Sequence, residues 1–314
     1  MAPCAAGPFA LLLVVSCKSS APRVLDATLA SPPPPVELRL ERAIRIEIID
    51  DFQPSGLLLQ GDHLLTVSDK HDHDVFEIVQ GQPNATLRTF VSFSPQTEGS
   101  LECDFEGIAR DVDGAFLLAS EAELRVLRVE STGRVSWITP SLATVGRGAG
   151  LFQKRNAGLE GIARLPDGRL LLAAERAPRG LVELPAKRNA VETSSDTRVW
   201  AMPDGIYPVA PGRECDFADL ATADGEVYAL ERNSHLVVRL ERTTDRWEER
   251  EAWSYARTEN DARFSYRDSR YGVAEGLAID RDHVYIVTDN NRLPRTADPD
   301  DHRPQLFVFA RPAR

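Results

Sequence analysis

The fold is decided by one stretch of sequence, Gly158-Leu159-Glu160-Gly161-Ile162-Ala163 followed by Leu170-Leu171-Leu172-Ala173-Ala174-Glu175. Two short apolar runs lie on either side of the polar turn Asp167-Gly168, and this arrangement predicts a β-hairpin. The same pattern occurs five times along the chain. Its equivalent positions, spaced 51, 54, 58 and 57 residues apart, are Gly56, Gly107, Gly161, Asp219 and Gly276.

Each repeat continues with further strand-like runs. The second unit adds Leu124-Arg125-Val126-Leu127-Arg128-Val129 and then Arg134-Val135-Ser136-Trp137-Ile138. Four strands in a unit of roughly 50 residues are typical of a β-propeller blade. No segment has a sustained helical period, which argues against a TIM barrel or a doubly wound sheet. The sequence therefore predicts an all-β propeller with five blades. A sixth blade requires more strands in the N-terminal region than the pattern reveals.

The last repeat lacks its outer strand. After its hairpin the chain offers one further run, Leu306-Phe307-Val308-Phe309, whereas unassigned runs lie near the N-terminus at Val36-Glu37-Leu38-Arg39-Leu40 and Ile44-Arg45-Ile46-Glu47-Ile48. Pairing the two termini in one blade closes the ring and hides the sheet edges. We therefore expect residues 37–314 to form a single propeller domain.

The N-terminus has the composition of a processing segment. Residues 7–17 form an apolar run too short to span a bilayer, and it ends in Val14-Val15-Ser16-Cys17, which resembles a bacterial lipobox. We expect residues 1–17 to be a lipoprotein-type signal, with lipid attached at Cys17, and the Pro-rich residues 18–36 to be a linker. This predicts an exported protein of the bacterial cell envelope that meets the membrane through its anchor alone. The first four residues contain no Lys or Arg, so a stray apolar N-terminus is the alternative.

Composition excludes several classes of protein. The 37 Lys and Arg against 48 Asp and Glu give a net charge of −11, which argues against a nucleic-acid-binding protein. A hydrophobic fraction of 42% excludes both a polytopic membrane protein and a disordered chain.

Cys103 and Cys215 occur in the same tetrapeptide, Glu-Cys-Asp-Phe. Export favours a disulfide between them, but equivalent positions in non-neighbouring blades should lie too far apart.

Acidic residues recur at two equivalent places. Glu106, Glu160 and Glu275 precede the apolar core of the first strand in their repeats, and an acid also follows each second strand. In a propeller these places share one face around the channel, where like charges cannot all stay ionised without a cation. Oxygen-rich sites suit Ca²⁺. The predicted metal ligands are Glu106, Glu160, Glu175, Asp219, Glu231, Glu275 and Asp289. The alternative is that these acids accept hydrogen bonds from backbone amides and pair with Arg176 and Arg232.

The same loops are rich in cations, and an acidic channel rimmed by cations suits an anionic ester. The predicted substrate-binding residues are Lys70, Asn156, Arg176, Arg232 and Arg292. Balanced charge on a solvated face is the alternative.

His71 and His73 form the one histidine cluster, but no third ligand for a transition metal is identifiable, and a solvated turn is favoured. The chain contains no Gly-x-Ser-x-Gly elbow, Walker loop or dinucleotide fingerprint.

Three motifs carry a resemblance to a known family. Leu159-Glu160-Gly161-Ile162-Ala163 with Ala174-Glu175-Arg176, Phe105-Glu106-Gly107-Ile108-Ala109 and Ala274-Glu275-Gly276-Leu277-Ala278 resemble the bacterial phytase-like, or esterase-like, propeller family over roughly residues 45–312. The resemblance implies an exported propeller that hydrolyses phosphoesters or carboxyl esters. Similar propellers, the calcium-dependent lactonases, hold Ca²⁺ in the channel. Glu106, Glu160, Glu175, Arg176 and Glu275 match the family pattern, whereas Ala218-Asp219 departs from its Glu-Gly.

Three hypotheses about function follow. The first is a metal-dependent hydrolase of small anionic phosphoesters or carboxyl esters, with its site at the channel mouth. The second is a non-catalytic surface lipoprotein that binds a ligand or a protein partner. The third is a structural propeller with neither role.

Overall fold

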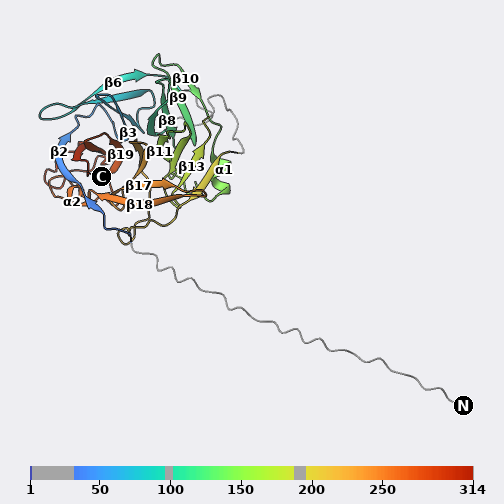
Figure 1. Cartoon of the computed structure of the whole chain (residues 1–314). Coiled ribbons are helices and arrows are strands. Elements are labelled where there is room, and N and C mark those ends of the chain that lie inside the picture. Colours follow the sequence, from blue (N-terminus) through green and yellow to red (C-terminus); the bar gives the residue numbers. More distant parts are fainter. Residues whose placement is uncertain (2–31, 96–101, 187–195, 314) are drawn as a thin grey trace. The chain divides into compact units, whose positions relative to one another are not determined.

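Five β-sheets surround one axis in the computed structural model, which describes residues 1, 32–95, 102–186 and 196–313 (Figure 1). The first sheet contains β3 (Pro54–Gln60), β4 (His63–Ser68), β5 (Asp74–Val79) and β6 (Thr86–Ser92). The second contains β7 (Phe105–Arg110), β8 (Phe116–Ser120), β9 (Arg125–Val129) and β10 (Val135–Trp137). The third contains β11 (Leu159–Arg164), β12 (Leu170–Ala174), β13 (Gly180–Leu184) and β14 (Arg198–Ala201).

The remaining two sheets include the N-terminal strands. The fourth contains β15 (Asp219–Ala223), β16 (Glu226–Glu231), β17 (Leu236–Arg242) and β18 (Trp247–Ser254), with β1 (Val36–Glu37) parallel to β18 at its edge. The fifth contains β19 (Ala274–Ile279), β20 (His283–Thr288), β21 (Gln305–Ala310) and β2 (Arg39–Arg45). Two short helices, α1 (Ala143–Gly148) and α2 (Ala256–Glu259), lie in connections. The predicted all-β propeller with five blades is confirmed.

The first strand of each repeat lies next to the axis. Strands β3, β7, β11, β15 and β19 contact one another around the ring, and Figure 1 shows β3, β11 and β19 near the middle with β6 and β10 at the rim. The backbones approach closely here: a Cβ added at Gly107 would lie 2.4 Å from the carbonyl oxygen of Glu160 in the next blade. Glycine at this repeat position therefore allows five inner strands to converge.

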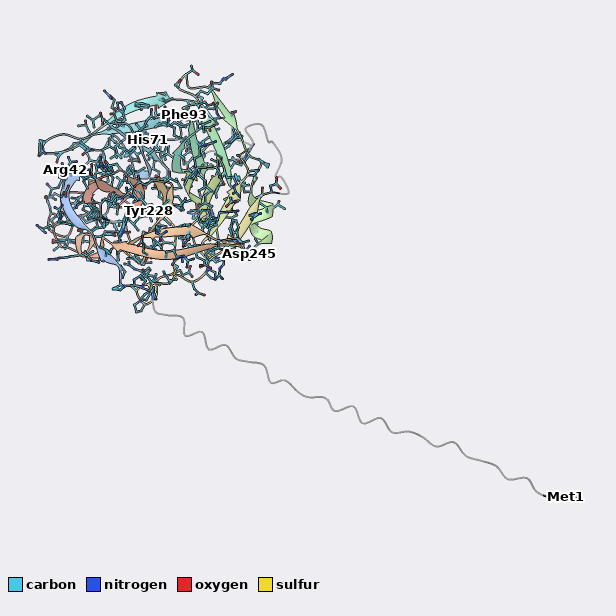
Figure 2. The ribbon with its side chains drawn as sticks, in the orientation of Figure 1. Met1, Arg42, His71, Phe93, Tyr228 and Asp245 are labelled. Carbon is cyan, nitrogen blue, oxygen red and sulfur yellow. The ribbon has the colours of Figure 1, made fainter. Side chains whose placement is uncertain are left out.

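The core lies between neighbouring sheets. Strands β8 and β12 are buried at every position, because both of their faces pack against a neighbouring blade. Leu117, Leu172 and Val182 belong to one such layer, between the second and third sheets. Figure 2 shows the buried Tyr228 toward the middle and the exposed side chains of Arg42 and Asp245 at the rim.

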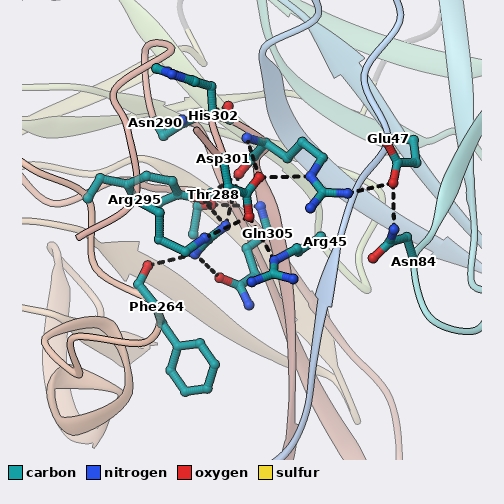
Figure 3. A network of polar contacts seen from close by, with 12 residues as sticks. Arg45, Glu47, Asn84, Phe264, Thr288, Asn290, Arg295, Asp301, His302 and Gln305 are labelled. Atoms are coloured by element: carbon teal, nitrogen blue, oxygen red, sulfur yellow. Dashed lines mark hydrogen bonds and ion pairs between the residues drawn. The ribbon is translucent and has the colours of Figure 1, made fainter. Parts of the chain in front are cut away.

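The ring is closed by the pairing of the two termini, as predicted. Strand β2 pairs antiparallel with β21, with Ala43 opposite Phe307. A polar network reinforces this closure (Figure 3). The carboxylate of Asp301 binds Arg45 of β2 at 2.7 Å and also the buried Arg295 at 3.2 Å. The N-terminal strand is thus held by ion pairs in addition to its backbone ladder.

Two further predictions concern the cysteine pair and the N-terminal segment. Cys103 and Cys215 are both free thiols, so the disulfide is not formed and the expectation from blade geometry holds. The predicted signal and its Cys17 lie outside the described residues. Among the residues that are described, no helix is both long and apolar enough to cross a membrane.

Candidate functional site

A β-bulge places an acidic side chain at the channel mouth in three blades. The pairing register shifts between Phe105 and Gly107 in β7, between Leu159 and Ile162 in β11, and between Ala274 and Gly276 in β19. A bulge re-aims the side chain at the extra residue. The residues at these shifts include Glu106, Glu160 and Glu275. Strand β15, where Ala218-Asp219 replaces Glu-Gly, pairs with β16 without a shift, whereas β3, where Ser55 replaces the Glu, keeps the shift.

Six carboxylates gather in two groups at this mouth. The first carboxylate group contains Asp69, Asp104 and Glu106, and the second contains Glu121, Glu160 and Glu175. Within each group, one oxygen atom from every residue lies within 4.8 Å of the others. Asp69, Glu121 and Glu175 directly follow the second strands of their blades, whereas Glu106 and Glu160 lie in the inner strands. The two equivalent acidic positions of the repeat therefore meet in space.

Local contacts fix two of these acids. The carboxylate of Asp72 accepts hydrogen bonds from the backbone N–H groups of Cys103 at 2.5 Å and Asp104 at 3.0 Å, and Asp104 adopts a left-handed φ of 56°. Glu121 Oε1 accepts a hydrogen bond from the N–H of Gly158 at 2.9 Å. A Cβ at Gly158 would lie 2.5 Å from Glu121 Cγ, so glycine is required for this approach.

Several carboxylate oxygens of the two groups lack a donor. Asp69 Oδ1 and Glu175 Oε2 are buried and, within the described part of the chain, have no hydrogen-bond partner. Glu160 is 6% exposed, and neither it nor Glu106 forms a hydrogen bond or ion pair with any other described residue. Burying a carboxylate oxygen without a partner is costly. A hard cation would supply the missing interaction, so these residues fit a metal ion.

Three cations of the chain already lie against the carboxylates. Arg232 binds Asp216 at 2.7 Å and Glu275 at 2.5 Å, and its third nitrogen contacts Glu175. Arg176 also pairs with Glu175 and donates to the carbonyl oxygen of Asn156 at 2.7 Å. On the other side of the mouth, Lys70 pairs with Asp69. The protein therefore neutralises part of the acidic charge itself.

Burial, with the remaining negative charge, raises the pKa values of the acids. Burial raises the pKa of Glu275 to about 7, although Arg232 opposes this effect. Burial, with Glu121 and Asp69 nearby, raises the pKa of Asp104 to about 7, and burial raises that of Asp289 to about 6. Burial raises the pKa of Glu160 well above its ordinary range, and the neighbouring Glu106 adds to this rise. Without a further cation, the cluster therefore holds protons near neutral pH.

Not every predicted metal ligand lies in these groups. Glu106, Glu160 and Glu175 do, and Glu275 and Asp289 lie beside them. Asp219 instead accepts hydrogen bonds from the backbone N–H groups of Leu57, Leu277 and Leu220 at 3.0, 2.8 and 2.8 Å. Glu231 binds the buried Arg179 and accepts a hydrogen bond from Ser234 at 2.6 Å. The alternative interpretation, backbone amides with Arg176 and Arg232 as partners, describes Asp219 through its amides and Glu175 and Glu275 through these arginines, whereas the arginine partner of Glu231 is Arg179.

The structure adds three acids to the candidate ligands. Asp69 and Glu121 carry a signal in the sequence, because each follows a second strand. The signal for Asp104 is weaker: it shares the tetrapeptide Glu-Cys-Asp-Phe with Asp216, which binds Arg232.

Some of the predicted substrate-binding residues lie at the carboxylate groups and others do not. Lys70, Arg176 and Arg232 lie at the carboxylate groups, and Asn156 contributes its carbonyl to Arg176. Arg292 pairs with Asp51 instead. The ring of His71 packs against two phenylalanines, Phe52 and Phe76, as a structural side chain would.

Comparison with known proteins decides the family. A family model described as "Phytase-like: Esterase-like activity of phytase" matches residues 53–292. The chain belongs to this family. The resemblance carried by the Glu-Gly motifs is thereby confirmed. A search of curated proteins found no match.

Several solved structures are similar to this chain at low identity. Glutaminyl cyclase from Myxococcus xanthus is 12% identical, with a TM-score of 0.51 over 89% of this chain and 100% of that chain. Virginiamycin B lyase from Staphylococcus aureus is 10% identical, with a TM-score of 0.43 over 88% of this chain and 75% of that chain. Aldose sugar dehydrogenase from Streptomyces coelicolor is 13% identical, with a TM-score of 0.45 over 89% of this chain and 100% of that chain. At this identity the likeness concerns the fold alone.

Proposed function

We propose that this member of the phytase-like family is a metal-dependent hydrolase of phosphoesters or carboxyl esters, with its site at the channel mouth. The observation that supports this most strongly is the pair of buried, donor-free oxygens, Asp69 Oδ1 and Glu175 Oε2, one in each carboxylate group. Asp and Glu oxygens are the ligands that Ca²⁺ prefers. A bound Ca²⁺ would polarise the ester oxygen as a Lewis acid.

The cations of the mouth would bind the substrate. The side chains of Lys70 and Arg176 are 43% and 29% exposed, and each pairs with a carboxylate group. Once a metal ion neutralises those carboxylates, both cations are available to anionic ester oxygens. Arg232 is held by three acids and is only 12% exposed, so its role is to position Glu175 and Glu275.

Glu275 is suited to proton transfer. It lies beside the carboxylate groups, and in the metal-free protein burial raises the pKa of its carboxyl to about 7, so that it holds or accepts a proton near neutral pH. Nη1 of Arg232 contacts both of its oxygens, at 2.5 and 2.6 Å, and so fixes the orientation of the carboxylate.

A specific observation favours the second hypothesis, a non-catalytic ligand-binding propeller. Arg232 already supplies a positive charge to Asp216, Glu175 and Glu275, so the protein balances this side of the mouth without a metal ion. A ligand could then bind at the mouth with no hydrolysis.

Turnover separates the two functions. Hydrolysis of 4-nitrophenyl phosphate and 4-nitrophenyl acetate is measured in millimolar CaCl₂ and in EGTA, for the wild type and Glu160→Gln. The matched control is Asp62→Asn, an exposed acid in the turn between β3 and β4. We expect hydrolysis of at least one ester that EGTA abolishes and Glu160→Gln lowers by about a hundredfold, as for a lost transition-state contact. A Ca²⁺-bound protein that hydrolyses neither ester would support the binding function.

We also propose export with lipid attachment at Cys17, on the strength of Val14-Val15-Ser16-Cys17. Such an anchor would place the channel mouth in contact with substrates outside the cytoplasm.

A further inference from the structure

A cavity of about 360 Å³ lies beside the carboxylate groups. Its walls come from the loops at the mouth-facing ends of β7 and β8 and from the connection that follows α1. A volume of this size falls in the range of small-molecule sites. Asp104 and Glu121, one from each carboxylate group, line it, so a molecule in this cavity would contact the proposed metal site.

The cavity combines an apolar floor with a cationic wall. Leu124, Phe152 and Ala157 form the floor and are 8%, 4% and 1% exposed. The exposed cations Arg147, Lys154 and Arg155 also line the cavity. The cavity therefore has an apolar part, an acidic part and a basic part.

Two of these cations have no acidic partner. Arg147 and Arg155 form no ion pair with any described residue, whereas Arg128, Arg169 and Arg232 each bind more than one acid. Lys154 pairs with Glu214 at 3.1 Å, with both side chains 56% exposed, and a contact so exposed is weak. Arg147 donates one long hydrogen bond from Nε to the carbonyl oxygen of Phe152 at 3.4 Å, which leaves its charge unpaired. The charges of both guanidinium groups are thus available to an anionic ligand.

We propose that this cavity, the leaving-group pocket, binds the alcohol portion of the ester and selects alcohols that carry a second anionic group on an apolar body. The proposal rests on the function proposed above. Hydrolysis adds water across the ester bond and gives the free acid and the alcohol. The reacting ester lies at the carboxylate groups, the apolar body lies on Leu124 and Phe152, and Arg147 and Arg155 bind the anionic substituent. Neutral alcohols leave both guanidinium groups without an anionic partner.

The test uses binding, so that it does not depend on turnover. Phenylphosphonate and 4-carboxyphenylphosphonate are non-hydrolysable mimics that differ in one carboxylate. Their affinities are measured by calorimetry in millimolar CaCl₂ for the wild type and the Arg147→Gln/Arg155→Gln double variant. The control is Arg198→Gln/Arg281→Gln, which changes two exposed arginines outside the cavity. We expect the wild type and the control to bind the carboxylated mimic about tenfold more tightly, and the double variant to bind both mimics equally.

The outcomes distinguish the two proposals. Equal affinities in the wild type, no binding of either mimic, or a preference that survives the double substitution would overturn the leaving-group pocket. If the preference is present and depends on Arg147 and Arg155, but neither 4-carboxyphenyl phosphate nor the carboxyl ester 4-acetoxybenzoate is hydrolysed, the pocket stands and the hydrolase function fails.

Discussion

Without a bound cation, the protein should become less stable as the pH rises from about 5 to about 8. Burial raises the pKa of Glu275 and Asp104 to about 7 and that of Asp289 to about 6. The unfolded chain releases these protons near pH 4, whereas the folded protein releases them near pH 6 to 7. Between these pH values the folded state therefore binds more protons than the unfolded state. The stabilisation from the protonated acids is complete below the unfolded pKa values and is lost as the pH rises through 6 to 7.

The size of the effect follows from Glu275 alone. Its pKa rises from 4.5 to about 7, and each pH unit corresponds to about 1.4 kcal/mol, so the free energy of unfolding should fall by roughly 3 kcal/mol. For a domain of this length that change lowers the melting temperature by roughly 5 to 10 °C.

Calcium should reverse the loss, but only at the higher pH. An ion present at a hundred times its dissociation constant stabilises the folded state by about 2.7 kcal/mol. Protonated carboxyl groups bind the ion poorly, so the Ca²⁺-dependent rise in melting temperature should be small near pH 5 and large near pH 8.

Melting curves in EGTA and in CaCl₂, at three pH values between about 5 and 8, measure both effects. Glu160→Gln removes a buried charge that has no partner, so at the highest pH it should raise the melting temperature in EGTA and reduce the gain from Ca²⁺. Asp62→Asn should change neither. A melting temperature in EGTA that rises with pH would refute this reasoning. So would a Glu160→Gln variant that is equally destabilised with and without Ca²⁺, since Arg232 would then already balance the charge.

Three further substitutions test other parts of the structure. Asp219→Ala removes the acceptor of three buried backbone N–H groups and should lower the free energy of unfolding by about 3 kcal/mol or more in urea titrations, with an unchanged gain from Ca²⁺. Gly158→Val should displace Glu121 and weaken Ca²⁺ binding by about tenfold in calorimetry; unchanged affinity would exclude Glu121 as a ligand. Cys17→Ala should move the protein from the membrane fraction to the soluble fraction of a bacterial host, and a wild type that is already soluble would contradict lipidation.

The sequence predicts the fold well because each blade repeats the same local features. Apolar runs around an Asp-Gly turn fix a hairpin, and the unpaired run at each terminus fixes the closure of the ring by β2 and β21. The assignment of Val36 and Glu37 to the last blade is wrong, because they form β1, which pairs parallel with β18 of the fourth blade. Strand β1 has two exposed residues, so its position depends on contact with a blade distant in the sequence rather than on any pattern of its own.

The candidate site is predicted less completely, because repeat position does not determine the partners of a side chain. Glu106 and Glu160 lie where the pattern predicts, because a bulge recurs with the motif. Asp219 shares the pattern, yet its carboxylate accepts hydrogen bonds from amides 58 and 162 residues away in the sequence. Asp104 depends on a left-handed backbone and on hydrogen bonds to Asp72 from another loop, and neither is visible in the repeat.

The location of the metal ion tests the central claim most directly. Crystals grown near pH 8 and soaked in CaCl₂ would be measured at long wavelength, where calcium scatters anomalously. We predict an anomalous peak at the channel mouth, about 2.3 to 2.6 Å from carboxylate oxygens that include those of Glu160 and Glu175. An empty channel mouth, with Glu160 paired to Arg232 instead, would contradict the account.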